Sequence, residues 1–341
     1  MKSNLNLNKH RKNNNKAIRR AASYGNTGSA SASSKHVHIA VIVIIALFAL
    51  FFTLNDIFFK IEGIPTWEDL YKSAGLTENI PAVEGDVSVH FVDVGQGDCE
   101  LIKTDSKAVL IDCGEKEYFS DVISYIKSQN IQRLDYVVVT HPHSDHMGGM
   151  SYILDEFDIG TVIMPEVQES AAPTTSAYMR LLKSVSNNKI SMEYAKAGTE
   201  YKLDDAVMTL LSPVNDYDNL NNYSVTVKLE HGGNSFLFTG DIEKKAETDI
   251  LNSGADVSAK VLKVAHHGST TSSGQKFINA VAPTYAVIEV GSPNDYGHPS
   301  DKTLELLEET DTVIYRTDLC GNIVFISDGS DFEILTEHEM N

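Results

Sequence analysis

Cysteine is scarce in this sequence, with three residues among 341. Cys99, Cys113 and Cys320 are an odd number, and each falls in a predicted strand, so a disulfide scaffold is excluded as the source of stability. Cys99 and Cys113 could be neighbours across a hairpin, which leaves one bridge open, although we expect buried free thiols. The chain is 42% hydrophobic and is long enough to sustain a core of its own.

Acidic residues are absent from the first 55 positions, which hold eight Lys or Arg. The remaining residues therefore carry 20 basic and 47 acidic side chains, a net charge of −27. Affinity for polyanions comes mainly from Lys and Arg, so this composition excludes a general nucleic-acid binder that acts through its overall field. A role on nucleic acid would have to depend on a metal site and on local basic residues.

Apolar periodicity is absent from residues 1–36, which are mostly Asn, Ser, Ala, Lys and Arg. Such a segment cannot bury enough surface to fold, and we expect a disordered basic tail. Residues 37–54 contain no charge and residues 57–59 are again apolar, which is enough for one membrane-spanning helix. A cleavable signal peptide is the alternative, but no small-x-small cleavage site follows the apolar run.

The distribution of charge orients this predicted transmembrane anchor, residues 37–59. Basic residues precede it and acidic residues begin at Asp56, so the positive-inside rule places the tail in the cytoplasm and the rest outside the cell. Residues 60–85 are expected to form a juxtamembrane connector. The sequence therefore predicts a single-pass protein of the cell membrane with an extracellular folded domain, residues 86–341.

This domain combines many predicted strands with helices that fall at intervals between them. Strands are predicted at residues 87–94, 99–104, 108–112, 134–139, 161–164, 189–195, 207–211, 224–230, 235–238, 260–264, 285–290, 312–315 and 323–326. Helices are predicted at 118–129, 147–157, 176–185, 243–252, 275–280 and 303–309. The order indicates an α/β fold of two sheets flanked by helices.

A motif dense in metal ligands follows the predicted strand 134–139. His141 and His143 lie two residues apart on a segment that Pro142 keeps out of a helix, so both imidazoles can face one side. Asp145 and His146 then turn to a second point nearby. This mixture of imidazole and carboxylate favours borderline cations such as zinc. A surface loop of unrelated histidines is the alternative, which the density of ligands opposes.

Other polar side chains are predicted at strand ends, where an active site in such a fold gathers its residues. They are Asp98, Asp112, Asp241, His266, His267, Ser269 and His298. Asp112 could orient a ligand histidine, and Asp241 could bridge two cations. Each position alone is weak evidence, because a strand that ends in a glycine turn is often only structural.

Together and in this order, the motifs resemble the metallo-β-lactamase superfamily and, within it, the extracellular domain of ComEC-type DNA-uptake proteins. The similarity rests on DVGQGD (93–98), LIDCG (110–114), THPHSDHMGG (140–149), FTGD (238–241), KVAHHGSTTSS (263–273) and NDYGHPS (294–300). The resemblance implies an αββα sandwich with two divalent cations between the sheet edges. It also implies that His141 and His143 hold the first cation, Asp145 and His146 the second, and Asp241 both.

One histidine of the HHG segment would complete the second cation site. We place His266 there and His267 beside the substrate, although the sequence leaves the reverse assignment open. Many family members add a third histidine to the first cation, but here the corresponding interval offers only residues 221–224 and His231, which falls in a predicted turn. We therefore expect Asn222 to be a polar group near the site. The residues expected to support the ligands or contact the substrate are Asp98, Asp112, Asn222 and Ser269.

These features predict a metal-dependent hydrolase that uses zinc, with manganese as the alternative. Two cations lower the pKa of a shared water and stabilise charge on phosphoryl oxygens, so phosphodiester hydrolysis fits best. The resemblance implies extracellular DNA as the substrate. The predicted catalytic residues are Asp145, Asp241, His267 and His298. Cell-wall or lipid phosphodiesters such as phosphocholine-bearing teichoic acids are the alternative, and β-lactam hydrolysis and a non-catalytic, metal-stabilised binding module are further ones. No protein partner can be inferred, and the family's multi-helix channel domain has no counterpart among the predicted elements.

Overall fold

The computed structural model describes residues 30–55, 64, 82–83, 85–168 and 171–339, with only the backbone described for residues 30–40. The chain divides into two compact units, Met1–Thr77 and Glu78–Asn341. The predicted tail, residues 1–36, and the predicted connector, residues 60–85, fall largely outside the described residues.

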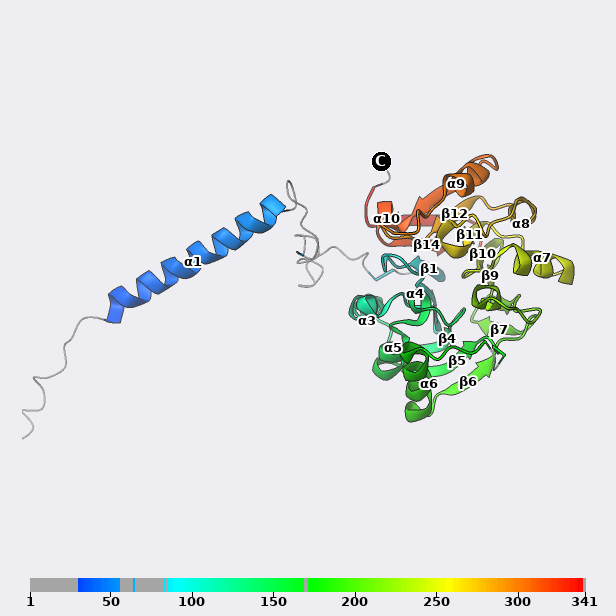
Figure 1. Cartoon of the computed structure of the whole chain (residues 1–341), viewed down its shortest axis with the longest axis horizontal. Helices are drawn as coiled ribbons and strands as arrows, with labels where there is room; N and C mark the ends of the chain where they lie inside the picture. The colour runs from blue at the N-terminus through cyan, green and yellow to red at the C-terminus, as the bar shows by residue number, and fades with distance from the viewer. Residues whose placement is uncertain (1–29, 56–63, 65–81, 84, 169–170, 340–341) are drawn as a thin grey trace, which may run out of the picture. The chain divides into compact units, whose positions relative to one another are not determined.

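The first unit contains helix α1 (Ala30–Leu54), drawn in blue in Figure 1. The predicted anchor, residues 37–59, is covered by this helix as far as Leu54, and residues 56–59 lie outside the described residues. Among the helices in the described part of the chain, none meets both the length and the apolarity that a membrane crossing needs.

The larger sheet of the second unit has eight strands in the order β15-β14-β1-β2-β3-β4-β5-β6. They are β1 (Val87–Phe91), β2 (Glu100–Thr104), β3 (Ala108–Ile111), β4 (Arg133–Val138), β5 (Asp158–Met164), β6 (Ser191–Tyr194), β14 (Ile323–Ser327) and β15 (Phe332–Thr336). Strands β3 to β6 run parallel to one another, and the remaining neighbours pair antiparallel.

The other sheet has seven strands in the order β13-β12-β11-β10-β9-β8-β7. They are β7 (Glu200–Leu203), β8 (Ala206–Leu210), β9 (Val227–His231), β10 (Asn234–Phe238), β11 (Val261–Lys263), β12 (Tyr285–Ile288) and β13 (Val313–Arg316). Strands β10 to β13 are parallel, so their carboxyl ends meet at one edge of the sheet.

Helices cover the outer face of each sheet, and the two sheets pack against each other. Helices α3 (Phe119–Ser128), α5 (Met150–Glu156) and α6 (Ser176–Asn188) share one apolar cluster with the eight-stranded sheet. Helices α7 (Lys244–Ser253), α8 (Gln275–Val281) and α9 (Asp301–Glu308) share another with the seven-stranded sheet. The fold is therefore the expected α/β sandwich of αββα layers.

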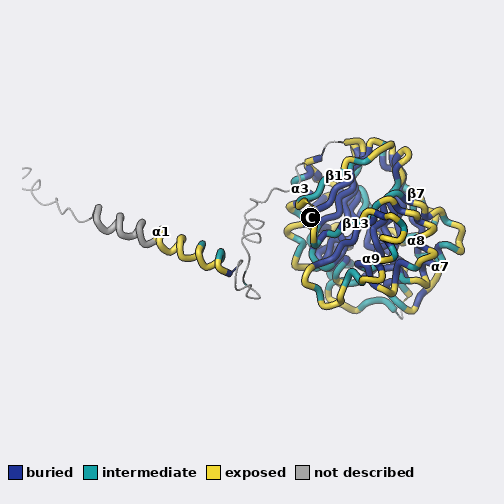
Figure 2. Tube along the Cα trace, turned by 90° about the horizontal axis from the view of Figure 1, so that it is seen from above, coloured by how far each residue is buried: buried dark blue, intermediate teal, exposed yellow. Residues whose placement is uncertain are grey.

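A third apolar cluster fills the space between the sheets. Phe91 on β1, Phe238 on β10 and Phe325 on β14 are fully buried there, and the ring of Phe91 contacts the other two. Each such side chain contributes roughly 1.5–3 kcal/mol when it leaves water. Figure 2 shows the strands in dark blue at the inside of this unit and exposed residues at its periphery.

The strands and helices predicted for residues 86–341 are all found, with ends that shift by up to three residues, but several short elements were missed. They are the edge strands β7 and β15, the four-residue helices α4 (Ser144–Met147) and α10 (Thr317–Cys320), and the 3-10 helices η2 (Lys116–Tyr118), η3 (Leu220–Tyr223) and η4 (Ala265–Gly268). Cys320 therefore lies in a helix, Cys99 precedes β2 and Cys113 follows β3, so the prediction that each cysteine lies in a strand is wrong. Cys99, Cys113 and Cys320 are buried free thiols, as expected.

Candidate metal centre

The HxHxDH segment connects β4 to helix α4 (Ser144–Met147). His141 is fully buried, and its Nδ1 lies 3.1 Å from Thr140 Oγ1 and 3.3 Å from Ser224 Oγ. His143 precedes α4 in extended conformation, as expected from the Pro142 that comes before it. The first turn of α4 then carries Asp145 and His146, which places both beside the ends of β3 and β10.

Four side chains converge on one point at the edge of the two sheets: Asp145, His146, Asp241 and His267. His146 Nε2 lies 3.3 Å from Asp241 Oδ1 and 3.9 Å from Asp145 Oδ2. His267 Nε2 lies 3.4 Å from Asp145 Oδ2 and 3.9 Å from Asp241 Oδ1. Ligand atoms about 2.0–2.2 Å from a tetrahedral zinc ion are about 3.3–3.6 Å apart, so this group has nearly the spacing that a cation would require.

A second group shares the same aspartate. It consists of His141, His143 and Asp241. His141 Nε2 lies 2.9 Å from His143 Nδ1 and 3.7 Å from Asp241 Oδ2. The two oxygens of Asp241 therefore face different ligand groups, Oδ1 towards His146 and Oδ2 towards His141.

The end of β10 fixes the position of Asp241. Gly240 has a φ of +49°, and a Cβ there would come within 3.0 Å of Thr140 and 3.1 Å of Ser224. Only glycine fits this left-handed conformation and close approach without strain. The backbone N–H of Asp241 donates to Ser224 Oγ at 3.1 Å. The carboxylate is thus held between the two histidine groups by its backbone.

Three buried atoms of the four-residue group have no hydrogen-bond partner among the described residues. They are His146 Nε2, His267 Nε2 and Asp241 Oδ1. A buried polar atom left without a partner is costly, and in native proteins most such atoms bind a partner, a water or an ion. These three atoms point to one location, which a divalent cation would satisfy. The donor set of imidazole and carboxylate matches zinc or manganese chemistry.

The HHG segment turns sharply after β11. His266 and His267 both have left-handed backbone conformations, with φ values of +53° and +52°. Two consecutive non-glycine residues in this region store strain of about 1–3 kcal/mol each, which is typical of functional sites. The turn sends the two rings in different directions, since His267 is buried and the side chain of His266 is 23% exposed.

This turn bears on the choice between His266 and His267, which the sequence left open. His267, not His266, lies in the four-residue group with Asp145 and His146. His266 Nε2 is 3.6 Å from Asp241 Oδ2, the oxygen that faces His141. The geometry therefore favours His267 as the ligand and His266 as the group beside an incoming substrate.

Hydrogen-bond partners orient His146 and His267 through the ring nitrogen of each that faces away from the cation position. His146 Nδ1 donates to Asp112 Oδ2 at 2.8 Å, and Asp112 also accepts from the backbone N–H of Thr140 at 2.8 Å. His267 Nδ1 donates to the Glu289 carbonyl at 2.9 Å and lies 3.2 Å from Asp98 Oδ1. Such contacts fix the tautomer of a ligand histidine and increase its basicity. Asp112 and Asp98 thus lie beside the Nδ1 atoms of His146 and His267.

A buried lysine that the sequence analysis did not single out stabilises this supporting layer. Lys263 Nζ donates to Asp98 Oδ2 at 2.6 Å and lies 3.9 Å from Glu289 Oε2, and both partners are fully buried. Glu100 completes a cluster of three buried carboxylates. Burial and the charge of Asp98 raise the pKa of Glu289 to about 8. One ammonium group therefore neutralises only part of this cluster, and proximity raises the affinity of the remaining carboxyls for a proton.

Three further predicted residues have different surroundings. Ser269 Oγ lies 3.1 Å from Thr271 Oγ1, which in turn lies 3.1 Å from His266 Nδ1, so Ser269 supports the HHG turn. The rings of His298 and His266 are 5.8 Å apart, which places His298 at the border of the site. Asn222 Oδ1 accepts from the backbone N–H groups of Glu243 and Ala246 at the start of α7.

The expectation that Asn222 is a polar group of the site is therefore revised. Its side-chain oxygen satisfies the amino end of a helix, and Ser224, two residues later, contacts His141 and the Asp241 backbone. His231 ends β9 and its Nδ1 lies 2.8 Å from Ser327 Oγ, away from both ligand groups. It has no contact with the cation positions among the described residues.

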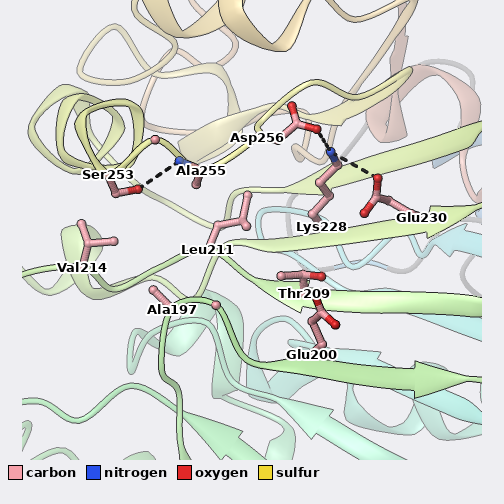
Figure 3. A pocket seen from close by; sticks show the side chains of 12 residues that line it. Ala197, Glu200, Thr209, Leu211, Val214, Lys228, Glu230, Ser253, Ala255 and Asp256 are labelled. Atoms are coloured by element: carbon pink, nitrogen blue, oxygen red, sulfur yellow. Dashed lines mark hydrogen bonds and ion pairs between the residues drawn. The ribbon is translucent and has the colours of Figure 1, made fainter.

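A separate pocket of about 470 Å³ lies along β7, β8 and β9 (Figure 3). Lys228 is the one basic residue among the four charged residues that line it, and its Nζ lies 2.7 Å from Asp256 and 3.5 Å from Glu230. None of the metal-centre residues lines this pocket. The ligand groups and the pocket are therefore distinct features.

The αββα sandwich, with imidazole and carboxylate side chains gathered at the edge of its two sheets, is the architecture of a metal-dependent hydrolase fold. The family model described as "Metallo-beta-lactamase superfamily" matches residues 92–291, which are 200 of the 341 residues. The chain belongs to this superfamily.

Three of its relatives are ComEC-type competence or recombination proteins. ComE operon protein 3 of Bacillus subtilis is 30% identical over 264 residues, which are 72% of this chain and 34% of that protein. Competence protein ComA of Neisseria gonorrhoeae is 27% identical over 268 residues, 77% of this chain and 36% of that protein. Recombination protein 2 of Haemophilus influenzae is 27% identical over 241 residues, 69% of this chain and 28% of that protein. The chain spans about a third of the length of these ComEC-type proteins.

Replacing Asn222 or Ser224 should separate a role in folding from a role in the site. Asn222→Ala leaves two N–H groups at the start of α7 without their acceptor and should lower the free energy of unfolding by about 1 kcal/mol, with metal affinity unchanged. Ser224→Ala removes the hydroxyl beside His141 and should lower metal affinity roughly 10- to 100-fold. Urea unfolding and metal titration measure the two effects. Equal metal affinity in both variants would contradict the assignment.

Replacing Lys263 should destabilise the protein strongly. Lys263→Met leaves three buried carboxylates without their cation and should cost about 3–5 kcal/mol of unfolding free energy. Lys245→Met is the matched control, because the side chain of Lys245, which pairs with Asp249, is 67% exposed, and its loss should change stability by less than about 1 kcal/mol. Chemical unfolding of metal-free protein measures both. A loss in Lys263→Met as small as that in the control would show that the buried cluster does not depend on this ammonium group.

Proposed function

We propose that this chain is a metal-dependent phosphodiesterase that hydrolyses nucleic acid. The observation that carries the proposal is the pair of ligand groups that share Asp241, because its two oxygens face His146 on one side and His141 on the other. Two divalent cations held there would activate a water and stabilise charge on the attacking and leaving oxygens of a phosphodiester. Zinc fits the ligands best, and manganese is the alternative.

The protein side chains position these groups and need supply no nucleophile. Burial raises the pKa of Cys99 and Cys113 well above the ordinary thiol value, so neither is a thiolate at neutral pH. Asp112 and Asp98 hold the rings of His146 and His267 through their Nδ1 atoms. These contacts keep the ligand atoms of His146 and His267 in place before substrate binds, which limits reorganisation during the reaction.

His266 and His298 lie on the substrate side of this arrangement. Burial and the neighbouring His266 lower the pKa of His298, so its imidazole is neutral at neutral pH. A neutral imidazole can donate a hydrogen bond to a phosphoryl oxygen or pass a proton to a leaving group. We therefore assign substrate contact to His266 and His298, in addition to the ligand roles of the other residues.

The relatives favour nucleic acid as the substrate. One relative is named for the ComE operon, one for competence and one for recombination, and the chain matches about a third of each protein. Phosphodiesters of the cell wall, including phosphocholine-bearing teichoic acids, have the same reacting group and are the second candidate. A binding module that uses the cations only for stability is the alternative of another class.

We also propose that the apolar segment 37–59 anchors the chain in the cell membrane, with the basic tail in the cytoplasm and residues 86–341 outside. The support is the uncharged run of residues 37–54 together with the eight basic and no acidic residues in the first 55. An anchor would keep the hydrolase at the surface, where its substrate enters.

Replacing the shared carboxylate should abolish activity. In the metal-loaded full-length protein, Asp241→Asn should reduce cleavage of a labelled oligonucleotide at least about 100-fold, because both cation positions lose a negative ligand. Asp158→Asn is the matched control, since Asp158 forms only an exposed pair with Arg133. Wild-type turnover in Asp241→Asn would exclude the dinuclear mechanism. Bound metals without cleavage of any phosphodiester would favour the binding module.

The membrane orientation has a direct test. Protease added to intact cells should digest residues 86–341 and leave a short basic fragment that carries the N-terminus, detected by an N-terminal epitope tag. Permeabilised cells are the control, in which the tag should also be lost. Protection of the catalytic unit in intact cells would reverse the orientation, and release of the whole chain into the medium would rule out the anchor.

A further inference from the structure

An exposed aromatic side chain stands next to the metal centre. Tyr296 is 70% exposed, more than any other large hydrophobic side chain described in residues 82–339. Its ring stacks on that of His298, with centroids 5.9 Å apart and planes at 22°. The His298 ring lies 5.8 Å from that of His266, whose Nε2 is 3.6 Å from Asp241 Oδ2. A row of three rings therefore leads from solvent to the shared carboxylate.

The loop that carries Tyr296 is fixed by its own hydrogen bonds. Asn294 Oδ1 accepts from the backbone N–H groups of Tyr296 and His298, and its Nδ2 donates to the carbonyls of Gly291 and His298. Both ends are attached to site segments, since Gly291 N donates to Gln96 Oε1 and Ser300 N donates to the Gly268 carbonyl. The aromatic ring is thus presented on a preorganised loop, which lowers the entropy that a ligand must offset on binding.

We propose that Tyr296 is a stacking platform for an unpaired nucleobase next to the phosphodiester to be cleaved, so that the substrate is single-stranded nucleic acid. This inference rests on the proposed function and specifies its substrate class. A flat exposed ring can stack on the face of any base, which gives affinity without sequence preference. In a duplex the faces of the bases are already stacked on one another, so only an unpaired or terminal base can reach Tyr296.

Because the protein is acidic, stacking on Tyr296 would supply a large share of the affinity for a nucleic acid. Beyond the first 55 residues the chain has a net charge of −27, and release of counterions from phosphates can contribute little to affinity. Stacking does not depend on a positive field. Stacking of a base on a ring next to the cation sites can therefore give an acidic protein an affinity for a polyanion that its own charge does not supply.

The arrangement of the rings favours a base over a quaternary ammonium group. Recognition of choline uses several aromatic faces that surround the cation. Tyr296 and His298 lie nearly parallel, so together they present one outer face and no enclosing walls. Binding of free phosphocholine to wild type and to Tyr296→Ala, measured beside the nucleic-acid strands, distinguishes a choline group from a base.

The experiment compares three substrates with the metal-loaded full-length protein. They are a labelled single-stranded oligodeoxynucleotide, a strand of equal length built from abasic units, and the duplex of the first. Wild type should bind and cleave the base-bearing strand best. Tyr296→Ala should raise its KM and its Kd roughly 5- to 150-fold, the range expected for loss of one stacked base, with kcat nearly unchanged. The abasic strand should be unaffected by the substitution.

Two further variants separate stacking from general apolar contact. Tyr296→Trp keeps an aromatic face and should restore affinity, whereas Tyr296→Leu keeps an apolar side chain and should not. Tyr296→Ala, Tyr296→Trp and Tyr296→Leu should all have the melting temperature of the wild type, because the side chain of Tyr296 is largely exposed. The ratio of Kd values between Tyr296→Ala and wild type should be the same at low and high salt, since no phosphate contact is lost.

Binding measured by fluorescence anisotropy keeps this inference distinct from hydrolysis. Equal Kd values for base-bearing and abasic strands, or unchanged binding in Tyr296→Ala, would overturn the stacking role even if cleavage is intact. Stacking-dependent binding without cleavage of any strand would retain the role of Tyr296 and reject the phosphodiesterase. Loss of phosphocholine binding in Tyr296→Ala, with binding of both strands unchanged, would replace the nucleobase by a choline group.

Discussion

The carboxylate of Asp241 is the constraint on which the rest of the site depends. It is buried, and its oxygens lie 3.3 Å from His146 Nε2 and 3.7 Å from His141 Nε2. Burial disfavours its charge, but the surrounding imidazoles hold its pKa well below the usual range. Such a group is stable only among positive partners. Its place at the end of β10, against a left-handed Gly240, requires the two sheets to meet at this edge.

Much of the fold and of the ligand set could be predicted from sequence. Alternation and turn residues locate the strands and place candidate ligands at strand ends. The division of these residues into two groups around Asp241 came from the resemblance of the motifs to a known superfamily. The order of His266 and His267 was not, because it depends on two consecutive left-handed residues that no periodicity reveals. Asn222 and Ser224 differ by two positions, and only tertiary contacts show which of them reaches His141.

The missed elements have related causes. Strands β7 and β15 are short, partly exposed edge strands with no continuous apolar pattern, and they form because a neighbouring strand offers its free hydrogen-bonding edge. Lys263 was not predicted as a structural residue because a lysine in a three-residue strand has no signal for burial until Asp98, 165 positions earlier, is placed beside it. Long-range pairs of this kind stabilise the supporting layer of the site.

The central claim, that two cations share Asp241, is tested most directly by anomalous diffraction from crystals of the zinc-loaded protein. The account predicts two peaks at the zinc edge, one among His141, His143 and Asp241 and the other among Asp145, His146, Asp241 and His267. A single peak, a peak coordinated by His266 in place of His267, or no peak with these side chains unchanged would contradict it.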